Sequence, residues 1–231
     1  MKTFHIVNKD LTEAAPETLF NSVSQSVDAE QQLSRQDSIV PLRLGDQDLV
    51  LKTYFRGGLP GRFIRKTYFY CGLERTRMWR EFSLLLAMRE RGLPVPSPLA
   101  ARCQVRSLLT YSGDLMMHRI NNSQTLAATI AKESLPITNW TRIGEIIADF
   151  HRHRVCHKDL NATNILLSED DSIHLIDFDK CSLLSSSPGK WAQDNLSRLR
   201  RSLNKHVEHK GLVHFDEKHW EALITGYLRA L

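Results

Sequence analysis

His157-Lys158-Asp159-Leu160-Asn161-Ala162-Thr163-Asn164 is the stretch that decides the fold of this chain. Apolar residues at helical spacing predict a helix over 139–153, directly before it. Two short apolar runs around a polar turn predict a hairpin over 165–176, directly after it. Asp177-Phe178-Asp179 stands at the far end of that hairpin. Oxygen-bearing side chains therefore occupy predicted loops at both ends of one rigid hairpin, where they can converge.

The chemistry that these side chains suit is phosphoryl transfer. Asn164 and Asp177 offer amide and carboxylate oxygens, which Mg²⁺ prefers, and Mg²⁺ leaves positions for substrate phosphates. Asp159 remains to take the proton from an attacking hydroxyl. The kinase signatures H-R-D-L-x-x-x-N and D-F-G become H-K-D-L-N-A-T-N and D-F-D here, in the same order. The two motifs predict a kinase that uses ATP and Mg²⁺.

A kinase also needs a Lys on an upstream strand and a Glu on the next helix. Lys52 ends an apolar strand run, from which its ammonium can reach nucleotide phosphates. Glu81 lies at the edge of the apolar stripe of a predicted helix, where burial of an unpaired carboxylate is unfavourable, so Lys52 is its natural partner. We assign both residues to catalysis and to cofactor binding, and we add His118 as a candidate cofactor-binding residue.

Each residue taken alone has a simpler interpretation. Lys52 would be a solvated strand-end residue and Glu81 a helix-surface charge, and Asp159 and Asn164 would be ordinary turn residues. The combined order of Lys, Glu, H-x-D-x-x-x-x-N and D-F-x argues against all of these readings together.

The chain divides into two predicted lobes after an N-terminal arm over 1–32, which is either a short helix or mobile. The N-lobe, 33–120, contains a hairpin over 39–55 with a turn at 45–46 and a helix over 75–91. Its other predicted strands cover 99–102, 107–111 and 115–120. The C-lobe, 121–231, is mainly helical and carries the catalytic loop and the metal site. This order predicts an α+β, protein-kinase-like two-lobe fold.

Composition narrows the class of protein further. The chain has 231 residues, a net charge of +5 and 42% apolar residues, which are typical of a soluble globular protein. No apolar stretch approaches the ~20 residues of a membrane-spanning helix, and no signal peptide is expected. The four widely spaced cysteines favour reduced thiols in a cytosolic protein over disulfides or a zinc site.

Two departures from protein kinases indicate a different acceptor. Asn161 stands where Ser/Thr kinases usually carry a Lys, and no A-P-E segment follows Asp179. The chain ends 52 residues after Asp179, which leaves little room for a peptide-docking region. A small or lipid-linked acceptor therefore fits better than a protein.

At this level of detail the sequence resembles the bacterial lipopolysaccharide kinases, and closely the 3-deoxy-D-manno-octulosonic acid (Kdo) kinases among them. The resemblance runs from about residue 49 to 205. Three of its features are particular to that family: the R-G-G-L block, the N-A-x-N pattern and the basic L-x-R-L-x-R-S-L segment. The matching segments are L-V-L-K-T-Y-F-R-G-G-L (49–59), T-R-M-W-R-E-F (76–82), G-L-P-V-P-S-P (92–98), H-K-D-L-N-A-T-N-I-L-L (157–167), L-I-D-F-D-K (175–180) and L-S-R-L-R-R-S-L (196–203).

The resemblance implies ATP-dependent phosphorylation of the 4-hydroxyl of Kdo on a Kdo–lipid A precursor. This reaction would take place at the cytoplasmic face of the inner membrane, with the enzyme bound peripherally. It also implies that Asp159 is the base, that Lys52 and Glu81 form the phosphate-binding pair, and that Asn164 and Asp177 hold Mg²⁺. Two positions depart from the family pattern: residues 33–38 lack the glycine-rich turn, and Thr163 replaces an expected His.

Basic residues gather in two places that suggest an anionic partner. The first run, Lys52–Arg80, has eight basic residues, one acidic residue (Glu74) and several interleaved aromatic residues. The second holds Arg198, Arg200, Arg201 and Lys205 with His206 and His209. A solvated face would explain both, but an anionic membrane surface that carries the lipid acceptor explains them better. No motif supports a nucleic-acid partner. Oligomerisation stays open.

Two rival functions also stay open. The same residues could phosphorylate another sugar, such as heptose. Alternatively, the missing glycines could mark a non-catalytic pseudokinase that binds glycolipid, although the intact catalytic residues argue against it.

Overall fold

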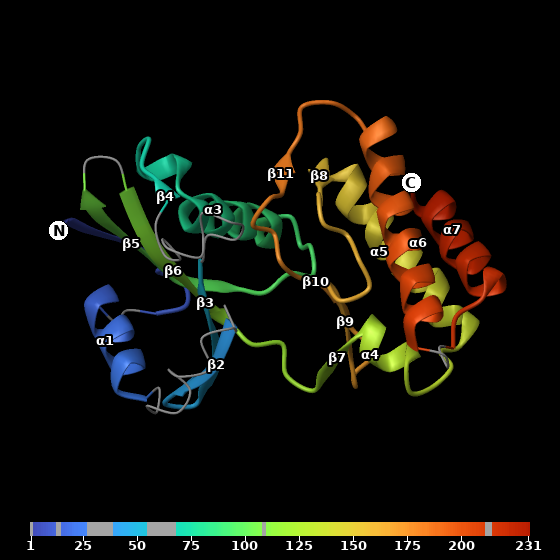
Figure 1. The fold of residues 1–231 in the computed structure, drawn as a ribbon, viewed down its shortest axis with the longest axis horizontal. Helices are drawn as coiled ribbons and strands as arrows, with labels where there is room; N and C mark the ends of the chain where they lie inside the picture. Colours follow the sequence, from blue (N-terminus) through green and yellow to red (C-terminus); the bar gives the residue numbers. More distant parts are fainter. Residues whose placement is uncertain (1, 13–14, 27–38, 55–67, 108–109, 211–213) are drawn as a thin grey trace. The chain divides into compact units, whose positions relative to one another are not determined.

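The computed structural model describes residues 2–12, 15–26, 39–54, 68–107, 110–210 and 214–231 (Figure 1). Its internal contacts divide the chain into two compact units. The first unit comprises Met1–Leu86 and Pro96–Arg119, and the second comprises Ala87–Val95 and Ile120–Leu231. No helix among these described residues has both the length and the apolar character of a membrane-spanning segment.

The first unit is built on an antiparallel sheet with the strand order β1-β5-β6-β3-β2, in which β4 pairs with β6. Its strands are β1 (Lys2–Val7), β2 (Ile39–Leu44), β3 (Gln47–Thr53), β4 (Tyr68–Phe69), β5 (Pro98–Ser107) and β6 (Thr110–His118). Its helices are α1 (Pro16–Ser26), the short 3₁₀ helix η2 (Leu73–Arg75) and α3 (Arg77–Glu90), whose last residues belong to the second unit.

The predicted hairpin at 39–55 is confirmed for its described residues. Strands β2 and β3 pair up to Leu44 and Gln47, so a two-residue turn connects them. Gly45 has a φ of 58°, a left-handed conformation that glycine adopts without a steric penalty. One expectation for the neighbouring strands is wrong: 107–111 is not a separate strand. Ser107 ends β5 and pairs with Thr110 at the start of β6, while 108–109 lie outside the described residues.

The sheet and α3 enclose the core of the first unit. Met78, Phe82 and Leu85 recur at helical spacing on α3 and are all buried, as the apolar stripe predicts. Gly113 on β6 permits this packing, because an added Cβ would lie 2.4 Å from the Met78 side chain. Part of the expected N-terminal arm also joins this unit, since β1 pairs along β5.

The second unit is mainly helical, with two small sheets. Strands β7 (Ser123–Thr125), β9 (Ile165–Ser168) and β10 (Ile173–Leu175) form one sheet, and β8 (Val155–Cys156) pairs with β11 (Ser182–Leu183). The helices are α4 (Leu126–Ile130), α5 (Ile137–Arg152), α6 (Lys190–Lys210) and α7 (Glu217–Ala230). The predicted helix over 139–153 and the hairpin over 165–176 are thus confirmed within a few residues.

Helices α5 and α7 pack against each other, with their backbones in close approach. Gly144 on α5 has no room for a side chain, because a Cβ there would lie 2.0 Å from the carbonyl oxygen of Leu223. Gly226 on α7 has the same relation to the carbonyl oxygen of Thr141, at 2.1 Å. Ile143, Ile147 and Phe150 of α5 are also buried, so packing holds this helix just before the chain enters β8 and the loop that carries Asp159.

Candidate active site

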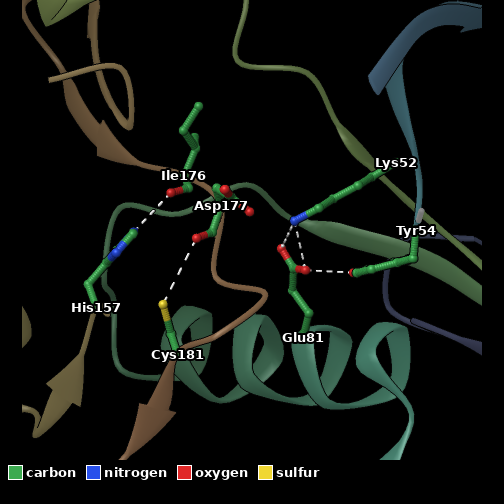
Figure 2. A network of polar contacts seen from close by, with 7 residues as sticks. All are labelled: Lys52, Tyr54, Glu81, His157, Ile176, Asp177 and Cys181. Atoms are coloured by element: carbon green, nitrogen blue, oxygen red, sulfur yellow. Dashed lines mark hydrogen bonds and ion pairs between the residues drawn. The ribbon is translucent and has the colours of Figure 1, made fainter. Parts of the chain in front are cut away.

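The first unit holds a buried charge cluster at the junction of β3 and α3. Lys52 Nζ donates hydrogen bonds to both carboxylate oxygens of Glu81, at 2.8 and 2.9 Å. Tyr54 donates its hydroxyl proton to Glu81 Oε2 at 2.6 Å, and Figure 2 shows the three side chains converging. Lys52 is 7% exposed and Glu81 2%. Because two ions this deeply buried need each other, the pair holds the ammonium in one position.

Sequence reasoning brought Lys52 and Glu81 together but missed Tyr54. Residues two apart along an extended chain point to the same side, so Tyr54 follows Lys52 onto the α3 face. That spacing could have indicated its role. His118 stands apart from the pair: it ends β6 opposite Leu49, whereas Lys52 pairs with Leu115. The three-residue offset corresponds to about 10 Å along the sheet.

The second unit holds the catalytic loop, which connects β8 to β9. His157 is buried between Phe178, with ring centroids 4.9 Å apart, and the loop backbone. Its Nε2 donates to the carbonyl oxygen of Ile176 at 3.0 Å (Figure 2). Burial lowers the pKa of His157, so the ring is neutral at pH 7. The motif histidine therefore joins the H-K-D segment to the residue that precedes Asp177.

Side-chain amides brace the loop around Asp159. The carbonyl oxygen of Asp159 accepts one hydrogen bond from Asn164 Nδ2 and one from Asn161 Nδ2, both at 3.0 Å. Asn161 Oδ1 accepts from the backbone N–H of Thr163 at 2.8 Å and from its hydroxyl at 2.6 Å. The two residues that depart from kinase and family patterns, Asn161 and Thr163, are thus partners of each other. They stabilise the loop while the Asp159 side chain stays partly exposed.

The two expected metal ligands come from adjacent backbone segments. The N–H of Ile176 donates to the carbonyl oxygen of Asn164 at 3.0 Å, which places Asn164 beside the residue before Asp177. Asp177 has a φ of 64°, a left-handed conformation that is uncommon outside glycine and frequent at functional sites. Since Asn164 Nδ2 binds the Asp159 carbonyl, its Oδ1 is the atom left for a cation. One amide and one carboxylate oxygen fit Mg²⁺, which retains water and phosphate ligands.

Helix α6 fixes the catalytic loop from the side, and sequence reasoning did not find these residues. Asn195 Oδ1 accepts from the backbone N–H of His157 at 3.1 Å, and Ser202 Oγ accepts from that of Ala162 at 3.2 Å. The only sequence signal was the seven-residue spacing, which places Asn195 and Ser202 on one face of a helix. The loop is therefore held near both ends.

Comparison with known proteins agrees with this architecture. The family model of the lipopolysaccharide kinase (Kdo/WaaP) family matches residues 31–227. A protein of Mannheimia succiniciproducens named 3-deoxy-D-manno-octulosonic acid kinase is 41% identical over 181 residues, which are 77% of this chain and 74% of that protein. A protein of the same name from Vibrio vulnificus is 42% identical over 177 residues, 77% of this chain and 73% of its own.

Among solved structures, one titled "WaaP in complex with acyl carrier protein" matches with a TM-score of 0.62. It covers 98% of this chain and 89% of its own, at 12% identity, so the likeness concerns the fold. The predicted α+β, protein-kinase-like fold is thereby confirmed. Both the family match and the identities of about two fifths lead to one conclusion: this chain is a member of the lipopolysaccharide kinase (Kdo/WaaP) family.

Proposed function

We propose that this protein is a kinase of lipopolysaccharide core biosynthesis that transfers the γ-phosphoryl group of ATP to a hydroxyl of Kdo. The observation that carries the proposal is the braced loop that presents Asp159, in a chain whose relatives are named Kdo kinases. The acceptor is a Kdo–lipid A precursor, and the hydroxyl is the one at the 4-position.

In this reaction the acceptor oxygen attacks the γ-phosphorus, the bond to ADP breaks, and the hydroxyl proton passes to Asp159. Phosphoryl transfer depends mainly on positioning and on stabilisation of charge. Lys52 contributes a fixed positive charge for the nucleotide phosphates, and Glu81 and Tyr54 hold its ammonium in place. Mg²⁺ held by Asn164 and Asp177 would supply further charge neutralisation at the phosphates.

A lipid-linked acceptor requires the enzyme to work at a membrane surface, and we infer peripheral binding at the cytoplasmic face of the inner membrane. The exposed basic side chains of α6 support this inference, since each basic residue near an anionic surface contributes about 1 kcal/mol. Much of the other basic run, 55–67, lies outside the described residues. Co-sedimentation with anionic vesicles at low salt tests the inference, and protein that stays in the supernatant with and without acceptor would contradict it.

The decisive experiment replaces Asp159 by Asn, which keeps the shape of the side chain but removes the base. Transfer of labelled phosphate from ATP to a Kdo–lipid A precursor should fall by about 10²–10⁴-fold, the usual contribution of a positioned base. Circular dichroism should be unchanged, because the hydrogen bonds of residue 159 in the loop use its backbone carbonyl.

Asp170→Asn is the matched control for this experiment. Asp170 is an exposed aspartate in the β9–β10 turn, and its oxygen accepts from the N–H of Ser172 at 3.0 Å, a bond that Asn can keep. The control should transfer phosphate at the wild-type rate. Full activity in Asp159→Asn would reject Asp159 as the base, and an inactive wild type would reject the proposed reaction.

A further inference from the structure

A pocket of about 840 Å³ opens beside the catalytic loop, entirely within the second unit. One wall is the loop itself and the other is a face of α6, which runs alongside it. The lining residues are Asp159, Asn161, Thr163, Arg198, Arg201, Ser202, Lys205 and His206. This volume lies in the range of 300–1,000 Å³ typical of small-molecule sites. We call it the α6 pocket.

The α6 wall of the pocket is strongly basic. Arg198, Arg201 and Lys205 follow one another at spacings of three and four residues, so their side chains share one face of the helix. His206 extends this face, whereas Asp159 is the single carboxylate among the described residues that line the pocket. The balance of charge would draw an anion into the pocket and would place it near the proposed base.

Among the described residues, ion pairs do not neutralise the three cations Arg198, Arg201 and Lys205 of this wall. In the part of the chain that the structure describes, no carboxylate forms an ion pair with Arg198, Arg201 or Lys205. Arg200, on another face of the same helix, does have such a role: it binds Glu217 at 2.7 Å and lies over the ring of Trp220. The pocket face of α6 therefore keeps a positive charge that a ligand can neutralise.

Two hydrogen bonds hold the helix that carries these cations against the catalytic loop. Ser202 lies among them on α6, and its hydroxyl accepts the N–H of Ala162 in the catalytic loop. Asn195 makes the corresponding bond to His157 two helical turns earlier. Because both bonds tie α6 to the loop, a charged group held by Arg198 and Arg201 would present a neighbouring hydroxyl to Asp159 in a defined orientation.

We propose that the α6 pocket binds an anionic group of the acceptor, and that Arg198, Arg201 and Lys205 select anionic over neutral acceptors. The proposal rests on the proposed function and adds its acceptor site. The ligand chemistry is a carboxylate or a phosphate ester, because the planar guanidinium fork binds both through paired hydrogen bonds. An octulosonic acid supplies a carboxylate next to its hydroxyls, and a lipid A precursor supplies phosphates.

The test compares Arg198→Gln/Arg201→Gln with the matched control Arg200→Gln, which removes an arginine of the same helix outside the pocket. The double variant should raise the KM for a Kdo–lipid A precursor by at least about tenfold, the usual effect of losing one charge-assisted hydrogen bond. The KM for ATP should change less than about twofold. The control should match the wild type in both. A rise in the KM for ATP, or no rise in the KM for acceptor, would overturn the proposal.

Two modified acceptors identify the source of the anionic group. One carries the Kdo carboxylate as its methyl ester, and the other lacks the lipid phosphates. The acceptor without the relevant anion should bind wild type and double variant equally, because the interaction is already absent. The double substitution could instead weaken the binding of both modified acceptors as much as that of the unmodified one. In that case the arginines do not bind an anionic group and the proposal is wrong.

A binding measurement without ATP separates this proposal from the proposed function. Equilibrium binding of the Kdo–lipid A precursor to wild type and to the double variant needs no transfer. Arginine-dependent binding in a wild type that transfers no phosphate would uphold the α6 pocket and reject the kinase reaction. Normal transfer together with acceptor binding that does not depend on the arginines would uphold the kinase reaction and reject the proposed role of the α6 pocket.

Discussion

Replacing both members of the buried pair Lys52–Glu81 should restore the stability that replacing either one removes, without restoring phosphoryl transfer. The side chains are 9% and 2% exposed, and the ammonium lies 2.8 Å from the carboxylate. Removing one partner leaves the other charge in a site that excludes water, and such losses amount to about 3–5 kcal/mol. Lys52→Met and Glu81→Leu should each lower the free energy of unfolding by that amount.

The double variant Lys52→Met/Glu81→Leu should lie within about 2 kcal/mol of the wild type. Two apolar side chains carry no desolvation penalty, and the main remaining loss is the acceptor of the Tyr54 hydroxyl. The single effects should thus fail to add, with an interaction energy of about 4 kcal/mol or more. Urea-induced unfolding followed by circular dichroism measures all four proteins.

The exposed pair Arg200–Glu217 provides the control cycle. Its side chains are 44% and 60% exposed, so its interaction energy should stay below about 1 kcal/mol. Additive single effects at Lys52 and Glu81 would refute the reasoning that the buried pair acts as one unit. Recovered transfer in the double variant would refute the assignment of Lys52 to the nucleotide phosphates.

Two further predictions concern the second unit. Gly144→Ala should lower the free energy of unfolding by about 1–3 kcal/mol, because its Cβ would meet the carbonyl oxygen of Leu223 at 2.0 Å. The control Gly189→Ala should be neutral, because the nearest atom to its Cβ is 4.0 Å away. Equal urea midpoints for the two variants would contradict this prediction. Burial lowers the pKa of His151 to about 4 from its usual 6.5, so the unfolded state binds the proton first and stability falls as the pH drops through this range. Wild type should therefore lose about 2 kcal/mol more between pH 7 and pH 5 than His151→Gln, and equal losses in urea titrations would show that the imidazole is not buried as described.

Local patterns along the chain were enough to predict most elements that carry the site. The apolar stripe of α3 and the hairpin around Gly45 depend on neighbours a few residues away, so their periodicity is visible in the sequence. The wrong prediction of a separate strand over 107–111 also comes from reasoning on local patterns. An alternating run shows that a chain is extended, but it does not show where the chain reverses, and the structure puts Ser107 opposite Thr110.

Those residues of the candidate site could be predicted that follow one another along the chain in the order of the kinase motifs. Lys52 and Glu81 were paired correctly because a buried carboxylate needs a cation and the order of motifs named one. Tyr54 was missed because the argument from the sequence gave the buried carboxylate one partner, the cation, and did not seek a second hydrogen-bond donor. His118 was named as a further cofactor-binding residue; the strand register places it three residues along the sheet from Lys52, and its role stays a prediction.

The sequence by itself determined the class of this protein, because the spacing within H-K-D-L-N-A-T-N and the order of motifs are properties of the chain. Tertiary structure alone decided what surrounds the loop. Asn195 and Ser202 reach His157 and Ala162 across 38 and 40 residues, and the same packing brings the basic face of α6 to Asp159. Contacts of this kind depend on the depth and rotation at which a helix packs, and those follow from close-packed side chains and not from any local pattern.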